Sequence, residues 1–226
     1  MPLSPDEEYL ARHCYGYGHW GADYWYIGLE EGQSKDGRDT ISARAEVWKE
    51  LKAKGMVDDG LCDIRAFHNH PKIDKKWFMP PRPPTQTTWR YLILSLKAHK
   101  GMDEGLEAIR AYQLNRWGRS DPKIGETCLI ELSGLPANSL STAREREAFR
   151  HDRTEVIRKK LLKYRPKFVV IYGNHQHKHW DQIIQQLKRD IPTQFLSVES
   201  PTARTARGKS KREYWKSVGQ SLRHNN

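Results

Sequence analysis

The sequence predicts an α/β domain in which two layers of helices enclose a short, mainly parallel sheet of four strands. Two observations predict this three-layer αβα arrangement. Four short apolar runs lack the alternation of polar and apolar residues that marks a strand with one wet face, so helices should cover both faces of these strands. Segments with helical periodicity separate the runs, and strands that alternate with helices are typical of parallel sheets.

Each predicted strand ends at a glycine or at a polar turn. In chain order the strands span residues 24–27, 127–130, 167–172 and 194–198. Gly28 follows the first strand, Glu131 the second, Gly173 the third, and Glu199 and Ser200 the fourth. Because parallel strands end at the same edge of a sheet and ligands bind beyond their carboxyl ends, we expect a functional site at these four positions.

Six segments carry the periodicity or the end signals of helices. Ser42 and Gly55 mark the start and stop of the first, and a capping pattern at Ser141 and Thr142 opens the fourth. In chain order the predicted helices span residues 42–54, 86–100, 103–117, 141–164, 179–190 and 212–222. Together with the strands they predict one domain over residues 1–226.

Composition narrows the class of protein. No apolar stretch in the 226 residues approaches the ~18 needed to cross a bilayer, and the acidic start of the chain lacks the apolar core of a secretory signal. The three cysteines, Cys14, Cys62 and Cys128, are far apart, which is typical of a reducing compartment, and they are too few for a four-cysteine zinc or iron–sulfur centre. We therefore expect a cytoplasmic protein without a membrane partner, associated with the nucleoid if it is bacterial.

Charge favours nucleic acid as the partner. The chain has 39 Lys and Arg against 28 Asp and Glu, a formal net charge of +11. Seven of these cations and only one acid, Glu213, lie beyond residue 200, so residues 201–226 are expected to form a basic DNA-contacting loop and a C-terminal helix. The alternative is a soluble protein that is merely basic.

The residues after the first strand have the character of a catalytic turn. They read Gly28, Leu29, Glu30, Glu31 and Gly32, which places two carboxylates between glycines. Glycine lets the backbone approach a ligand, and a carboxylate can orient water or stabilise a cation. A solvated acidic turn would explain the same residues.

The order of the strand-end motifs resembles the uracil-DNA glycosylase superfamily. Residues 28–32 occupy the place of its glycine-led first motif, and residues 131–136 resemble the polar residue and proline-containing loop after its second strand. Residues 164–173 are similar to its "R-P-K, apolar strand, G" pattern, and residues 200–202 approximate its H-P-S motif. The likeness covers residues 24–32 and 127–215. Ser200 replaces the histidine of the last motif and Glu31 the proline of the first, so the resemblance is to a divergent member of the superfamily. The three cysteines are too few for its iron–sulfur branch.

This resemblance implies a DNA glycosylase that flips out uracil or a related deaminated base and releases it by hydrolysis, without a cofactor or metal. Glu30 would hold the attacking water and stabilise the cationic sugar, and Glu31 would take this role if the alignment shifts by one residue. The implied base-binding residues are Gly28 and Leu29 through the backbone, the Ser133 hydroxyl, Glu131, Phe67 as a stacking ring, and His175. Glu131 would accept from the N3–H of uracil or be protonated, or it would serve as a structural acid instead, and Trp77 and Phe78 are alternative stacking rings.

The DNA partner, single- or double-stranded, would meet the last strand end of a monomeric protein. The residues expected to press on the strand and pair with its phosphates are Ser200, Pro201, Thr202, Arg204, Arg207 and Lys209.

Three other functions remain open. A metal-dependent nuclease or phosphohydrolase would use Glu30, Glu31 and Glu131 with a histidine as ligands, although the alternating His175, His177 and His179 are more typical of a solvated turn than of a metal site. A non-catalytic nucleic-acid-binding module would use the basic tail and aromatic residues alone. A hydrolase of small nucleosides would be indifferent to salt.

Overall fold

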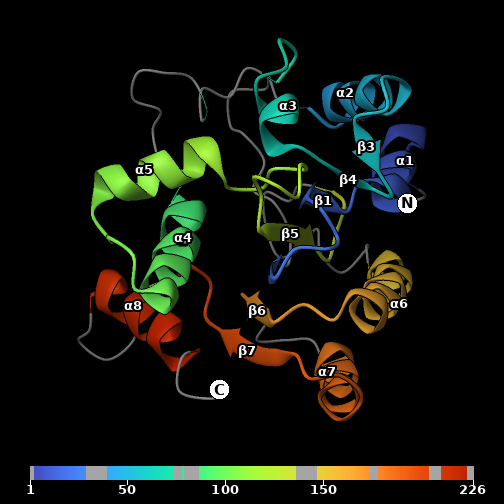
Figure 1. Ribbon diagram of the computed structural model, residues 1–226. Coiled ribbons are helices and arrows are strands. Elements are labelled where there is room, and N and C mark those ends of the chain that lie inside the picture. Colours follow the sequence, from blue (N-terminus) through green and yellow to red (C-terminus); the bar gives the residue numbers. More distant parts are fainter. Residues whose placement is uncertain are drawn as a thin grey trace.

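The computed structural model describes residues 3–28, 40–73, 78, 87–135, 147–173, 178–203 and 210–222 (Figure 1). Within these residues the chain forms a sheet enclosed by helices, and the predicted α/β class is confirmed. The strands are β1 Gly16–Gly18, β2 Tyr24–Gly28, β3 Val57–Asp58, β4 Leu61–Cys62, β5 Thr127–Glu131, β6 Phe168–Tyr172 and β7 Gln194–Val198. The helices are α1 Pro5–His13, α2 Ile41–Ala53, α3 Ile64–His68, α4 Thr87–Lys100, α5 Leu106–Asn115, α6 Glu147–Tyr164, α7 Lys178–Asp190 and α8 Lys211–Ser221.

The predicted count of four strands is wrong, because the described residues alone form a sheet of seven strands in the order β3-β4-β1-β5-β2-β6-β7. The four predicted strands are present as β2, β5, β6 and β7, and their neighbours in the sheet pair in parallel. The three additional strands are two or three residues long and contain no apolar run. Strand β1 runs antiparallel to β5, which makes the sheet mixed.

One of the missed elements has a recognisable turn. Asp59 and Gly60 join β3 to β4 with φ angles of 48° and 84°, as in the two-residue hairpin turn that favours an Asp-Gly pair. Helix α1 also carries a readable start, because Ser4 and Glu7 form a capping box and Pro5 stands at the first helical position.

Burial on both faces explains why the central strands lack alternation. Tyr26, Leu129 and Val170 pack into a core beneath α2, α4, α5 and α8, while Trp25, Ile130 and Ile171 pack into a second core beneath α6 and α7. Figure 1 shows α4, α5 and α8 on one side of the sheet and α6 and α7 on the other. No helix of the described residues is long and apolar enough to span a membrane.

Most predicted helices are confirmed with small shifts of their ends. Helix α2 is capped by Thr40, whose side chain accepts a hydrogen bond from the Ala43 amide, rather than by Ser42. The Asp103 carboxylate accepts from the Gly105 amide in the loop before α5, so this helix begins later than predicted. The predicted start of α6, residues 141–146, lies outside the described residues.

The path of the chain creates a switch point between β2 and β5. The chain leaves β2 through the helices of the first core and leaves β5 through α6 of the second core. Neighbouring parallel strands whose connections depart to opposite faces leave a crevice at their carboxyl ends, where α/β proteins bind ligands. The residues at these ends are Gly28 and Glu131, which pair in register.

Candidate functional site

A hydrogen bond joins the ends of β5 and β6 across the end of β2, which lies between them. The Tyr172 hydroxyl, at the end of β6, donates to Glu131 Oε1, at the end of β5, over 3.2 Å. Strand β2 lies between these two strands and ends in Gly28. A Cβ atom at Gly28 would lie 2.4 Å from the Tyr172 hydroxyl and 2.6 Å from Glu131 Oε2. The absence of a side chain at Gly28 therefore lets a carboxylate and a phenol meet across the central strand.

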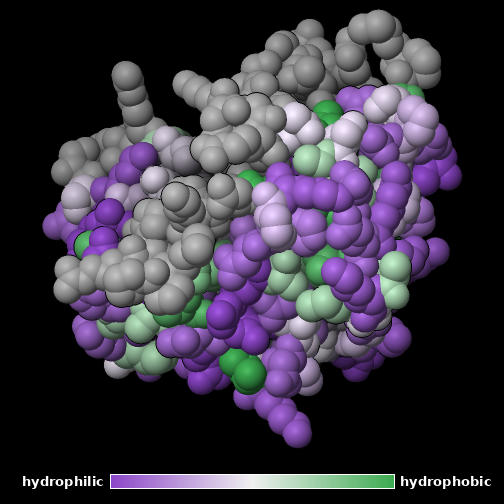
Figure 2. Space-filling model, turned by 90° about the horizontal axis from the view of Figure 1, so that it is seen from above, coloured by the Kyte–Doolittle hydropathy of each residue, from purple (hydrophilic) through white to green (hydrophobic). Residues whose placement is uncertain are grey.

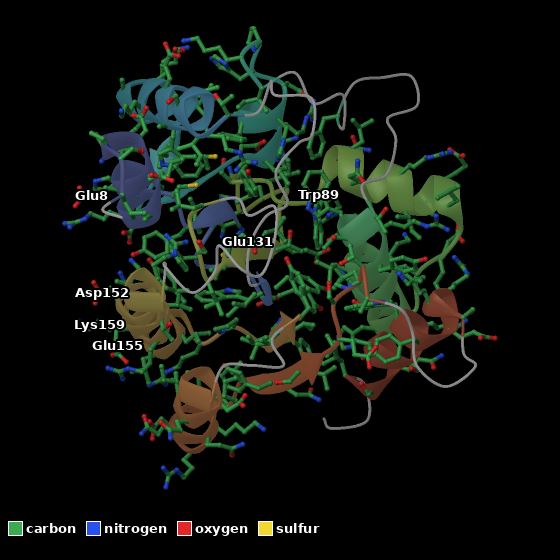
Figure 3. All side chains as sticks on the ribbon, turned by 180° about the vertical axis from the view of Figure 1, so that it is seen from behind. Glu8, Trp89, Glu131, Asp152, Glu155 and Lys159 are labelled. Carbon is green, nitrogen blue, oxygen red and sulfur yellow. The ribbon has the colours of Figure 1, made fainter. Side chains whose placement is uncertain are left out.

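The Glu131 side chain is partly buried, and its Oε2 atom is shielded from solvent. Figure 3 shows Glu131 near the middle, whereas Glu8 of α1 and Asp152 and Glu155 of α6 lie at the outside. Burying a charge is costly unless hydrogen bonds hold it. A partly buried carboxylate at a switch point is therefore a candidate functional group.

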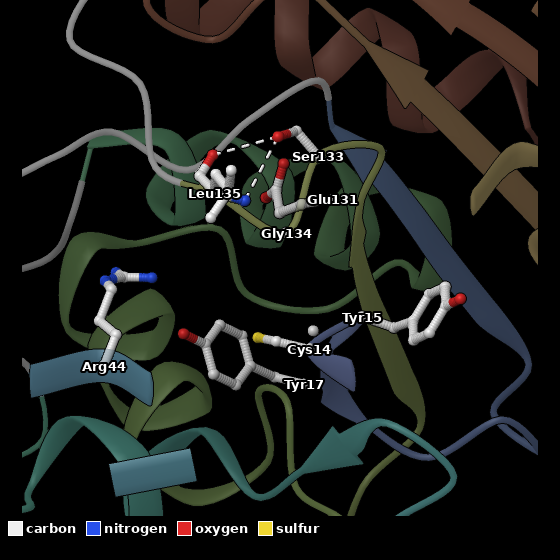
Figure 4. A pocket seen from close by; sticks show the side chains of 9 residues that line it. Cys14, Tyr15, Tyr17, Arg44, Glu131, Ser133, Gly134 and Leu135 are labelled. Carbon is white, nitrogen blue, oxygen red and sulfur yellow. Dashed lines mark hydrogen bonds between the residues drawn. The ribbon is translucent and has the colours of Figure 1, made fainter. Parts of the chain in front are cut away.

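A narrow pocket opens beside Glu131 (Figure 4). Its empty space is about 270 Å³, counted with its open mouth, and it leaves room for about one water molecule between its walls. The lining residues come from the end of β5 and the segment after it, from β1 and the α1–β1 connection, and from α2: Glu131, Ser133, Gly134, Leu135, Cys14, Tyr15, Gly16, Tyr17 and Arg44.

Ser133 holds the turn after β5 together. Its hydroxyl donates to the Leu135 carbonyl and accepts from the Leu135 amide, both over 3.3 Å (Figure 4). The hydroxyl proton is therefore used within the turn, in contrast to the expectation that it donates to a base. Ser133 shapes the wall of the pocket through this bond.

A buried arginine holds together the backbone segments that form the site. The Arg153 guanidinium of α6 donates to the carbonyls of Leu132 at 3.1 Å, Ala11 at 2.7 Å and Glu131 at 2.7 Å, and it lies 4.3 Å from the centre of the Tyr15 ring. Burial lowers the pKa of Arg153 below its ordinary value. The sequence interpretation missed Arg153, because one arginine on a helix rich in cations carries no signal of its burial.

Phe67, the expected stacking ring, lies in the core and does not line the pocket. It is 1% exposed and packs against Tyr17 and Trp48, with ring centres 5.7 and 5.8 Å away. Phe78 is equally buried, and Trp77 lies outside the described residues. The aromatic residues that line the pocket are Tyr15 and Tyr17, and Tyr17 stands between Gly16 and Gly18 in β1.

Arg44 gives the pocket a positive wall. This arginine of α2 is 3% exposed, and its guanidinium carbon lies 5.4 Å from the centre of the Phe67 ring. Figure 4 shows Arg44 and Tyr17 on the side of the pocket away from Glu131 and Ser133. The sequence interpretation did not single out Arg44.

The fourth strand end lies at the same edge of the sheet. The Gly173 amide donates to the Val198 carbonyl, which brings Ser200 beside the end of β6. The hydroxyls of Ser200 and Thr202 are hydrogen-bonded at 2.8 Å, and the Lys211 ammonium donates to the carbonyls of Pro201 and Thr202. Residues 200–202 thus form a turn held by α8, beyond the Tyr172 side of the site.

The other expected site residues lie outside the described residues: Leu29, Glu30, Glu31, His175, Arg204, Arg207 and Lys209. Gly28 and Gly173 nevertheless show where the chain leaves β2 and β6. In the part of the chain that the structure describes, no group of three or more His, Cys, Asp or Glu side chains could hold a metal ion. Comparisons with protein-family models, curated proteins and solved structures found no match.

Proposed function

We propose that this protein is a DNA glycosylase that releases uracil or a related deaminated base from DNA. The observation that supports the proposal most is the pairing of Gly28 with Glu131 at the switch point. The two adjacent carboxylates Glu30 and Glu31 follow Gly28 in the sequence by two and three residues. The formal net charge of +11 suits a polyanionic substrate.

In this proposal the carboxylates have separate roles. Cleavage of an N-glycosidic bond develops positive charge on the sugar, and Glu30 or Glu31 would stabilise that charge and hold the attacking water. Glu131 would read the base. The Tyr172 hydroxyl donates to its carboxylate, and a charged carboxylate accepts N–H donors. Uracil presents an N–H at position 3, whereas cytosine has an unprotonated nitrogen there.

Base binding requires the pocket to widen. The space between its walls holds about one water molecule, which is less than a nucleobase needs. Tyr17 and the Leu135 turn line opposite sides of the pocket, and either could move. Side-chain rearrangement at a binding surface is common, and a flipped base enters a pocket that closes around it.

The test is release of uracil from single- and double-stranded oligonucleotides in the presence of a chelator, followed by alkaline cleavage at abasic sites. The proposal expects metal-independent release, reduced in Glu131→Gln because an amide presents a donor as well as an acceptor to the base. Glu107→Gln, at an exposed position of α5, is the matched control and should behave as the unchanged protein.

Two results would contradict the proposal. A requirement for added divalent metal, or strands cut without alkali, would indicate a nuclease. DNA binding without any released base would indicate a non-catalytic binding module.

A further inference from the structure

A second pocket lies at the same edge of the sheet, beside the first. It is formed by the end of α1, the last turn of α2 and the β3–β4 turn, and its lining residues are Arg12, His13, Tyr15, Lys52, Val57, Asp59 and Gly60. Its empty space is about 480 Å³, counted with its open mouth. Tyr15 lines both pockets, so the two are neighbours. We call this second pocket the Lys52 pocket.

Cations dominate the walls of the Lys52 pocket. Lys52 makes no ion pair with any described residue, and Arg12 pairs with Glu8 at 2.7 Å through side chains that are 64% and 48% exposed. An ion pair this exposed is weak, because water and salt screen it. The one carboxylate of the lining, Asp59, is paired with the Lys160 ammonium.

The pKa of His13 is affected by the two cations of the pocket. Burial is the main cause that lowers the pKa of His13, and the neighbouring charges of Lys52 and Arg12 lower it further. The imidazole also packs on the Tyr9 ring, with ring centres 4.8 Å apart. An anion bound between these groups would offset the two cations and raise the pKa of His13.

A simpler account covers part of this arrangement. Helices α1 and α2 both end here, and cations near a helix C-terminus are stabilising. That effect needs no cavity, however, and it does not bring cations from two helices around one open space. The face of the molecule seen from above in Figure 2 is mainly hydrophilic in its described residues.

We propose that the Lys52 pocket binds a phosphate group. Arg12 and Lys52 supply the two kinds of cation that bind phosphate, a fork of N–H donors and a point charge. On a DNA strand, this group is a backbone phosphate next to the nucleotide whose base enters the first pocket. This second statement rests on the proposed function, whereas phosphate binding itself does not.

The first experiment titrates the protein with inorganic phosphate and follows the His13 ring by NMR. The expected result is a saturable shift and a higher pKa of His13 at saturation, both lost in Lys52→Gln and in Arg12→Gln. Lys54→Gln is the matched control, because Lys54 caps the same helix, is exposed and does not line the pocket. A shift that does not saturate, or that is equal in Lys52→Gln and Lys54→Gln, overturns the proposal.

The second experiment measures binding of a single-stranded oligonucleotide over a range of salt concentrations. Loss of one phosphate contact should flatten the plot of log affinity against log salt by about 0.7 in Lys52→Gln but not in Lys54→Gln. If the slope is unchanged in Lys52→Gln while the unsubstituted protein binds inorganic phosphate saturably, the pocket binds a free phosphate compound rather than DNA. Neither readout uses base release, so failure of the glycosylase proposal and failure of this one are distinguishable.

Discussion

Replacement of Gly28 by alanine tests the centre of the site. The new Cβ atom would lie 2.4 Å from the Tyr172 hydroxyl oxygen, 2.6 Å from Tyr172 Cζ and 2.6 Å from Glu131 Oε2. These atoms are side-chain ends, so the expected response is that the phenol and the carboxylate move apart and their hydrogen bond breaks. Overpacking of this kind costs about 1–3 kcal/mol, and a domain of this size loses about 2–4 °C in Tm for each kcal/mol.

The same replacement should also slow base release. A hydrogen bond to a charged group contributes about 1.5–3 kcal/mol, which corresponds to roughly a 10- to 160-fold loss in kcat/KM if Glu131 reads the base in the transition state. Thermal unfolding measures the loss of stability, and single-turnover release of uracil measures the loss of activity.

Gly21→Ala is the matched control, since a Cβ at Gly21 would meet its nearest atom, His19 Nδ1, at 3.5 Å. Because one of the short contacts at Gly28 is with a hydroxyl, the double variant Gly28→Ala/Tyr172→Phe should be destabilised by less than the sum of its parts. A Gly28→Ala protein as stable and as active as Gly21→Ala would refute the reasoning.

Three further predictions concern the Arg153 hydrogen bonds, the pH dependence of stability and the chemical step of base release. Arg153→Lys should lower the free energy of unfolding by about 2–4 kcal/mol, measured by urea denaturation, because an ammonium cannot reach all three carbonyls that the guanidinium joins. Burial tends to raise the pKa of Glu126, but hydrogen bonds from Lys100 and Tyr112 outweigh it and hold the pKa below its ordinary value. This stabilisation should be complete above about pH 5 and fade as the pH falls below 4.5, so Glu126→Gln should flatten the acid side of the stability profile, and an unchanged profile would contradict this. Glu30→Gln should slow the chemical step far more than it weakens DNA binding, measured by single-turnover kinetics and titration, and a larger effect at Glu31 would move the assignment.

Much of the local structure could be predicted from the sequence. The strands β2, β5, β6 and β7 are apolar runs long enough to be read, because burial on both faces imposes continuous hydrophobicity. Strands of two or three residues, such as β1, carry too few side chains to show a period, and β1 exists because Gly16 and Gly18 let its backbone approach β5 closely. Capping signals predicted helix ends only to within a few residues, because Thr40 and Ser42 are equally good candidates and packing selects between them.

The place of the candidate site in the fold was predicted from the sequence, but the side chains that contact one another there were not. The sequence alone determined that polar and glycine residues stand at four strand ends and that parallel strands bring such ends to one edge. Only the tertiary structure decided that β2 lies between β5 and β6, and so that Tyr172 and Glu131, far apart in the chain, meet over Gly28. The same packing buried Arg153 beneath the site and Phe67 in the core. The physical reason is that a residue's local pattern reports which element it joins, whereas strand order and side-chain burial depend on contacts between elements distant in sequence.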